Sequence, residues 1–352
     1  MPVFNAAKFL PDTLASIVDQ TYLGPIEVRV SSKCSTDTSL SLLEEFASGV
    51  CAGHDRLSAV TSSAASTGNT PGNGPGFARN RAVAQSHGDY LCFLDSDDIM
   101  MPARIEKQLA ASMTRSTAIV GSRFVRDPAD ATARYTTWCN ELTGAQLYLQ
   151  QYREVTIIQP TWFMPRSVFD TVGGYREDAA DASPSSERVR AIGSGKEPFP
   201  EDLVFFHCHL DGGGTLHKVE EPLLTYRYVA TSQSWRTSRR TLLRHRVAAF
   251  SRRVLPSWPS FTIWGCGRDG KHFYNDLSAE DRAKVVAFAD IDARRVGTSY
   301  HHAVTGANVP IVHFTDAKAP IVCCVALGRD PEFEANVRSL GLTEGKDFWF
   351  FV

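Results

Sequence analysis

Three carboxylates lie within four residues at Asp95-Ser96-Asp97-Asp98. They directly follow residues 90–94, a continuous apolar run typical of a buried parallel strand. Open α/β sheets bind ligands at the carboxyl ends of their strands, and carboxylate oxygens suit Mg2+ and Mn2+. We therefore predict a divalent metal site at Asp95, Asp97 and Asp98. The alternative interpretation is an acidic cap on the helix that follows.

A second acidic pair, Glu201 and Asp202, precedes the apolar residues 203–206 and is typical of the start of a buried helix. A carboxylate in this position can take the proton from an attacking hydroxyl group. We predict that the pair is catalytic, with Asp202 as the general base and Glu201 beside it. Taken alone, an aspartate before a helix is more often a cap than a base.

Two arginines have the surroundings of phosphate ligands. Arg79 lies at the start of a predicted helix after a glycine-rich stretch, and Arg227 follows the strand-like residues 223–224. A guanidinium and the N–H groups of a helix N-terminus both bind phosphate oxygens. Each arginine could equally form a surface ion pair, and the sequence leaves the two interpretations open.

Five motifs occur in the order found in family-two glycosyltransferases of the GT-A fold, which the chain resembles. The motifs are Pro2-Val3-Phe4-Asn5, Phe77-Ala78-Arg79-Asn80, Leu94-Asp95-Ser96-Asp97-Asp98, Gly173-Gly174-Tyr175 and Glu201-Asp202. The resemblance implies an α/β fold with a GT-A nucleotide-sugar-binding domain and sugar transfer with inversion at the anomeric carbon. It also implies nucleotide contacts at Pro2, Val3, Asn5, Asp37, Arg79, Asp95 and Arg227.

A narrower resemblance runs through the whole chain, to the galactosyltransferases that modify queuosine in tRNA. It rests on YLCFLDSDDIMMP (90–102), PTWF (160–163), PEDL (200–203), YRY (226–228), FTIW (261–264) and KVVAF (284–288). This resemblance implies UDP-galactose as the donor and queuosine-containing tRNA as the acceptor. The alternatives are a cytosolic transferase that makes another glycoconjugate and a catalytically inactive, tRNA-binding relative.

Three features depart from the wider family. Ser32-Lys33 stands where the family has an aspartate pair that holds uracil, although Asp37 is nearby. Val229 follows Tyr228 where the family often has a histidine that could bind the metal. The opening Met1-Pro2-Val3 is also shorter than a complete first strand, and Met1 is typical of an internal methionine taken as a start.

The periodicity predicts an alternation of strands and helices in two domains. Residues 1–233 are expected to form the GT-A domain, residues 234–257 a basic linker helix, and residues 258–352 a small Rossmann-like C-terminal domain. We expect a loop over residues 62–76. Residues 178–196 lack an apolar period and are expected to form a disordered insertion.

The predicted linker helix carries seven arginines and no acidic residue between residues 234 and 255. Leu243, Val247, Phe250 and Val254 form an apolar stripe with helical spacing, which should pack against other residues. The arginines then either lie on a solvated helix between the domains or contact the phosphate backbone of tRNA.

The C-terminal part contains Gly265-x-Gly267-x-x-Gly270 after a predicted strand, with Asp290 a further 20 residues along the chain. This is the spacing of a dinucleotide-binding fold. Sugar transfer needs no hydride, so we favour a structural glycine turn over a nucleotide site.

The composition is that of a globular protein, with 43% hydrophobic and 22% charged residues among 352. A net charge of −2 gives no overall basic field. The eight cysteines have neither CxxC spacing nor a disulfide framework, which predicts reduced thiols. No long apolar run or leader sequence is visible, so we expect a cytoplasmic protein that does not bind membranes.

Overall fold

The structure is a computed structural model, and it describes residues 1–33, 35–50, 53–64, 74–177, 199–229, 237–326 and 332–352. The predicted α/β fold class is confirmed, with two compact units. Unit 1 comprises residues 1–144 and 157–237, and unit 2 comprises residues 145–156 and 238–352. Within the described residues, no helix combines the length and apolar character that crossing a membrane requires.

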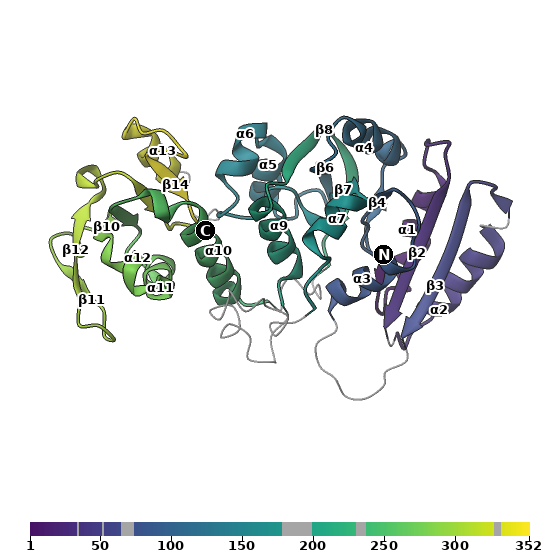
Figure 1. Cartoon of the computed structure of the whole chain (residues 1–352), viewed down its shortest axis with the longest axis horizontal. Helices are drawn as coiled ribbons and strands as arrows, with labels where there is room; N and C mark the ends of the chain where they lie inside the picture. Colours follow the sequence, from purple (N-terminus) through teal and green to yellow (C-terminus); the bar gives the residue numbers. More distant parts are fainter. Residues whose placement is uncertain (34, 51–52, 65–73, 178–198, 230–236, 327–331) are drawn as a thin grey trace. The chain divides into compact units, whose positions relative to one another are not determined.

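Unit 1 contains two sheets and the helices that cover them (Figure 1). Its strands are β1 (Pro2–Val3), β2 (Ile26–Lys33), β3 (Leu57–Ala64), β4 (Tyr90–Cys92), β5 (Ile99–Met100), β6 (Ala118–Asp127), β7 (Phe163–Pro165) and β8 (Thr215–Arg227). Its α-helices are α1 (Leu10–Val18), α2 (Ser39–Glu45), α3 (Pro75–Ala84), α4 (Arg104–Met113), α5 (Ala133–Glu141), α7 (Arg166–Val172) and α9 (Glu201–Asp211).

The first sheet of unit 1 is parallel, in the order β1-β2-β3, and the second is mixed, in the order β4-β7-β6-β8-β5. One apolar core joins both sheets, and it includes Val30 of β2, Leu94 after β4 and Phe124 of β6. The acidic motif at residues 95–98 follows β4 at the carboxyl end of that strand, as predicted.

The prediction of a loop over residues 62–76 is wrong at both ends. Residues 62–64 belong to β3, which pairs with β2 along its whole length, and α3 already begins at Pro75. The end of β3 is hard to recognise in the sequence, because its serine and alanine residues lack the alternation of apolar residues that marks residues 26–30 of β2. Residues 65–73, like the predicted insertion at 178–196, lie outside the described residues.

Unit 2 is built on a six-stranded sheet in the order β11-β12-β10-β9-β13-β14, parallel apart from β11. Its strands are β9 (Phe261–Trp264), β10 (Val285–Asp290), β11 (Ser299–His301), β12 (Asn308–His313), β13 (Ile321–Cys323) and β14 (Phe348–Phe350). Its α-helices are α10 (Arg239–Arg253), α11 (Arg268–Asp276), α12 (Ala279–Ala283) and α13 (Glu332–Ser339), and α6 (Gly144–Leu149) begins at the boundary.

Helix α10 is part of the core of unit 2. The predicted stripe is buried, because Leu243, Val247, Phe250 and Val254 are each at most 6% exposed and pack in one cluster with Tyr152. Four arginines of this helix form ion pairs within the same unit. Arg239 contacts Asp269, Arg240 and Arg244 contact Asp276, and Arg246 contacts Glu154.

We expect Gly121→Ala to destabilise unit 1. A Cβ at this position of β6 would lie 1.9 Å from Ile157 Cγ2 and 3.0 Å from Thr161 Oγ1, and both neighbours are fully buried. Overpacking of this kind costs about 1–3 kcal/mol. Thermal unfolding measures the change, with Gly144→Ala as the control because no heavy atom lies within 4 Å of its Cβ. Equal melting temperatures for the two variants would contradict the packing described for β6.

Candidate active site

The three aspartates of the acidic motif differ in their surroundings. Asp98 is fully buried, and its Oδ1 accepts a hydrogen bond of 3.0 Å from the Arg227 backbone N–H. Burial, together with the charges of Asp95 and Asp97, raises the pKa of Asp98 well above its usual value. Burial also raises the pKa of Asp97 to about 6, and Asp95 adds to this rise. The motif therefore concentrates negative charge in a partly dehydrated place.

Arg79 joins the two acidic motifs that the sequence separates by about a hundred residues. Its Nη2 donates to Asp95 Oδ1 at 2.7 Å, and its Nη1 donates to Glu201 Oε1 at 2.9 Å. The residue is only 5% exposed. Burial disfavours the charged guanidinium, but Asp95 and Glu201 outweigh burial and raise the pKa of Arg79. Arg79 is therefore a buried cationic bridge, and neither of the ion pairs lies on the surface.

Close packing of α3 against α9 makes this bridge possible. A Cβ on Gly76, in the first turn of α3, would lie 2.8 Å from Glu201 Cγ and 3.2 Å from Tyr175 Cβ. The next residue after Arg79 fixes the turn at residues 173–175, because Asn80 Nδ2 donates to the Tyr175 carbonyl and Asn80 Oδ1 accepts from the Tyr175 N–H. Gly173 and Gly174 have φ values of 84° and 79°, which favour glycine.

The predicted catalytic pair opens α9, as expected. Burial and the neighbouring Asp202 raise the pKa of Glu201 to about 7, and Arg79 opposes this rise. Asp202 lies in the same first helical turn and is less buried than the fully covered Leu203 after it. Glu201 is thus held by Arg79, while Asp202 Oδ1 accepts a hydrogen bond of 2.7 Å from the Leu203 N–H. The assignment of the general base to Asp202 stays a prediction.

Arg227 lies at the end of β8 and is held on both sides. Its Nη2 donates to Asp12 Oδ2 at 2.6 Å, and its Nε lies 3.9 Å from Asp127 Oδ2. Its guanidinium also lies over the Phe9 ring, 5.6 Å from the centroid. The backbone of the same residue binds Asp98. Arg227 is 9% exposed, so it connects α1 with the acidic motif.

The predicted nucleotide residues at the N-terminus gather around one corner of the parallel sheet. Pro2 and Val3 pair with Ser31 and Ser32 of β2, and the Val3 side chain is in the core. Asn5 follows in a left-handed conformation, with φ 48°, and its Oδ1 accepts from the Thr36 N–H at 2.8 Å. Asp37 accepts from the Ala7 N–H at 3.0 Å, and its pKa is lowered chiefly by the Ser39 hydroxyl.

The sequence analysis missed the residues that hold the acidic loop in place. Thr13 and Ser16 of α1 and Gln20 just after it are buried and bind the backbone of this segment: Thr13 donates to the Ser96 carbonyl, Ser16 accepts from the Met100 N–H of β5, and Gln20 donates to the Met101 carbonyl. The spacing of Thr13 and Ser16 places these two on one face of the helix and could have revealed them. Arg104 is also fully buried and donates to the carbonyls of Phe93 and Pro160.

Trp162 belongs to the core of unit 1. It is fully buried, and its indole N–H donates to the Ile157 carbonyl at 2.8 Å. Its ring packs against Tyr175, Phe205 and Phe206.

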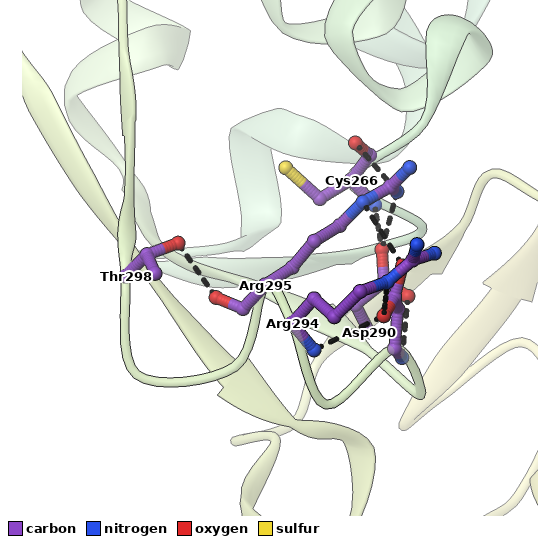
Figure 2. A network of polar contacts seen from close by, with 6 residues as sticks. Cys266, Asp290, Arg294, Arg295 and Thr298 are labelled. Carbon is purple, nitrogen blue, oxygen red and sulfur yellow. Dashed lines mark hydrogen bonds and ion pairs between the residues drawn. The ribbon is translucent and has the colours of Figure 1, made fainter.

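In unit 2 the carboxylate of Asp290 is engaged inside the protein, as Figure 2 shows. It accepts hydrogen bonds from the N–H groups of Cys266 and Asp292 and from Arg295 Nη1, at 3.0–3.1 Å. The glycine turn itself needs glycine, because a Cβ on Gly270 would lie 1.9 Å from the Gly265 carbonyl oxygen. These contacts agree with the structural turn that the sequence favoured, and nucleotide binding at the motif stays the alternative.

The N-terminal part of the chain is similar to known proteins. Residues 1–173 match the family model described as glycosyl transferase family 2. The chain is 32% identical over 117 residues to the putative teichuronic acid biosynthesis glycosyltransferase TuaG of Bacillus subtilis, a match that covers 33% of this chain and 42% of that protein. It is 31% identical over 99 residues to the poly(ribitol-phosphate) β-N-acetylglucosaminyltransferase TarS of Staphylococcus aureus, over 28% of this chain and 15% of that protein.

Among solved structures, S. aureus TarS residues 1–349 in complex with UDP-GlcNAc aligns with a TM-score of 0.48 at 14% identity, over 78% of this chain and 68% of that one. This chain matches the curated relatives TuaG and TarS over less than half of their own length. The family model covers both the corner at residues 2–5 and the acidic motif at residues 95–98. The first 173 residues of this chain, just under half of it, are therefore similar to glycosyl transferase family 2.

Proposed function

We propose that this protein transfers a sugar from a nucleoside diphosphate sugar to a hydroxyl group, with inversion at the anomeric carbon. The observation that carries the proposal is the Arg79 bridge between Asp95 and Glu201. Arg79 contacts both the acidic motif at residues 95–98, which is suited to the donor, and the Glu201-Asp202 pair, which is suited to the acceptor. The family match of residues 1–173 supports the same reaction class.

A divalent cation fits the charge of this site. Arg79 and Arg227 each already contact two carboxylates, so they leave the charge of Asp97 and Asp98 incompletely balanced. Among the described residues no group of three His, Cys, Asp or Glu side chains is arranged as a metal site by itself. A cation held by Asp97, with Asp95 or Asp98, would therefore complete its coordination with diphosphate oxygens. Bound there, Mn2+ or Mg2+ would neutralise charge on the departing diphosphate.

On the acceptor side, we assign proton removal to Asp202. Glu201 is held by Arg79, and Asp202 follows it in the first turn of α9, where its side chain is partly exposed. A carboxylate at this point can accept the hydroxyl proton as the oxygen attacks the anomeric carbon. The uridine end of the donor is assigned to the corner formed by Pro2, Val3, Asn5 and Asp37, whose backbone and side chains converge there.

The narrower resemblance supports a narrower proposal, the transfer of galactose from UDP-galactose to queuosine in tRNA. The ion pairs of α10 argue against one part of this proposal, the contact of its arginines with the tRNA backbone. They assign Arg239, Arg240, Arg244 and Arg246 to acidic partners in unit 2, so these side chains are poor candidates for phosphate contacts. Mass spectrometry of tRNA nucleosides from cells with and without the protein tests this acceptor, and galactosyl-queuosine should disappear with the protein.

A different acceptor is the second candidate. The relatives TuaG and TarS are named for teichuronic acid and poly(ribitol-phosphate), which are polymers and not tRNA. If galactosyl-queuosine is unchanged while the purified protein hydrolyses or transfers from a UDP-sugar, this candidate replaces tRNA. A protein that binds tRNA but uses no UDP-sugar would be the inactive relative instead.

We expect UDP binding to require a divalent cation and the Asp97 carboxylate. Calorimetry should give tight binding with Mn2+ and at least about tenfold weaker binding in EDTA, because the diphosphate then meets uncompensated carboxylates. Asp97→Asn should abolish the effect of Mn2+. The control is Asp170→Asn, which removes an exposed carboxylate from α7. Equal UDP affinity with Mn2+ and with EDTA would refute the metal assignment.

We expect Asp202→Asn to retain UDP binding and to lower turnover at least about a hundredfold, the usual contribution of a general base. Asp211→Asn, at the other end of α9, serves as the control for a lost helix charge. Initial rates with saturating UDP-sugar and acceptor provide the measurement. Near-normal turnover of Asp202→Asn would exclude this residue as the base.

A further inference from the structure

Strands β6 and β8 lie side by side (Figure 1), and their paired residues Arg126 and Tyr226 are neighbours of the acidic motif. On the other side of β8, Ile99 of β5 pairs with Thr225. The preceding residue, Asp98, therefore stands opposite Tyr226. One row across three strands thus contains Asp98, Tyr226 and Arg126, and neighbouring strands in such a row are about 5 Å apart.

Arg126 is held by aromatic rings. Its guanidinium lies over the Tyr226 ring, 4.0 Å from the centroid, and 5.6 Å from the centroid of the Phe124 ring. A planar guanidinium that stacks on an aromatic face keeps the N–H groups along its edge for other partners. In the part of the chain that the structure describes, these groups form no hydrogen bond or ion pair, and Nε is buried. Arg126 is thus a positioned cation whose donors are unused.

Other arginines of the same two strands have acidic partners. Arg123 of β6 contacts Glu220 at 2.6 Å, and Arg227 of β8 contacts Asp12 at 2.6 Å. The Nε of Arg126, by contrast, has lost water without gaining a partner among the described residues, which is unfavourable for a polar group. An anion that accepts hydrogen bonds from this guanidinium would compensate for the loss.

The Tyr226 side chain lies within electrostatic reach of both Arg126 and the acidic motif. Burial raises the pKa of Tyr226, the charge of Asp98 adds to the rise, and Arg126 opposes it. Asp98 also accepts a hydrogen bond from the Arg227 backbone N–H, which holds the acidic motif against the end of β8. Arg126 is therefore separated from the motif by one aromatic side chain, a gap that a diphosphate group can bridge.

We propose that Arg126 binds phosphate oxygens of the donor's diphosphate, with Tyr226 as the platform that positions its guanidinium. The inference rests on the proposed function, because it assumes that the acidic motif and a divalent cation bind a nucleoside diphosphate sugar. Arg79 and Arg227 already contact carboxylates, whereas Arg126 has its donors available. Loss of Arg126 should therefore weaken binding of the diphosphate and not of the uridine.

Binding measurements on the whole chain with Mn2+ test the proposal, by calorimetry for UDP and by NMR titration for uridine. Arg126→Met removes the charge and keeps a flexible apolar chain over the two rings, so the fold should be retained. Affinity for UDP should fall at least about tenfold, the size of one lost charge-assisted hydrogen bond, and affinity for uridine should change by less than about twofold. Arg126→Lys keeps the charge and should recover part of the UDP affinity.

Arg115→Met is the matched control. Arg115 is exposed and lies just before β6, at the opposite end of that strand from Arg126. It donates to the Ala111 carbonyl and the Thr114 hydroxyl. Its loss should leave UDP affinity unchanged. Melting temperatures show whether each variant is folded, and Arg126→Gln replaces Arg126→Met if methionine destabilises unit 1.

Unchanged UDP affinity in a folded Arg126→Met or Arg126→Gln variant would overturn the proposal. An equal loss of affinity for UDP and for uridine would also overturn it, because the damage would then lie at the uridine corner and not at the phosphates. If the unmodified chain does not bind UDP with Mn2+, the donor site under Proposed function is wrong, and the role of Arg126 is overturned with it.

Discussion

The site in unit 1 depends on one buried guanidinium. Arg79 holds Asp95 and Glu201 at once, and it does so from a helix that Gly76 allows to pack against α9. Without that cation, at least four acidic side chains would approach one another in a place where burial already raises the pKa of Asp97 and Glu201. Because a buried charge is tolerated only when it is paired, the bridge couples the position of α9 to that of the acidic motif.

Around this bridge, buried side chains hold the backbone by hydrogen bonds. Thr13 and Ser16 of α1, with Gln20 after it, bind the segment from Ser96 to Met101, and Arg104 donates to the carbonyls of both Phe93 and Pro160. Such contacts use the backbone of the segment and not the carboxylates of its aspartates. In unit 2 the arrangement is different, since the carboxylate of Asp290 beside the glycine turn accepts hydrogen bonds from Cys266, Asp292 and Arg295.

The sequence predicted the parts of this structure that depend on local patterns. The apolar run at residues 90–94 gave β4 and its acidic end, and the spacing of Leu243, Val247 and Phe250 gave a buried helix face. It could not predict that Arg79 would bridge two motifs, because that pairing depends on how α3 meets α9. The arginines of α10 likewise looked free for nucleic acid, since their partners Asp276 and Glu154 are distant in sequence.

If the proposed function is right, the acidic motif at residues 95–98, which Arg79 ties to α9, binds the metal and diphosphate of a sugar donor. Diffraction at the manganese absorption edge, from crystals grown with UDP and Mn2+, tests it most directly. The account predicts an anomalous peak between the diphosphate and the Asp97 carboxylate, with uracil near Asn5 and Asp37. A manganese ion away from Asp97, or UDP bound at the glycine turn of unit 2, would contradict it.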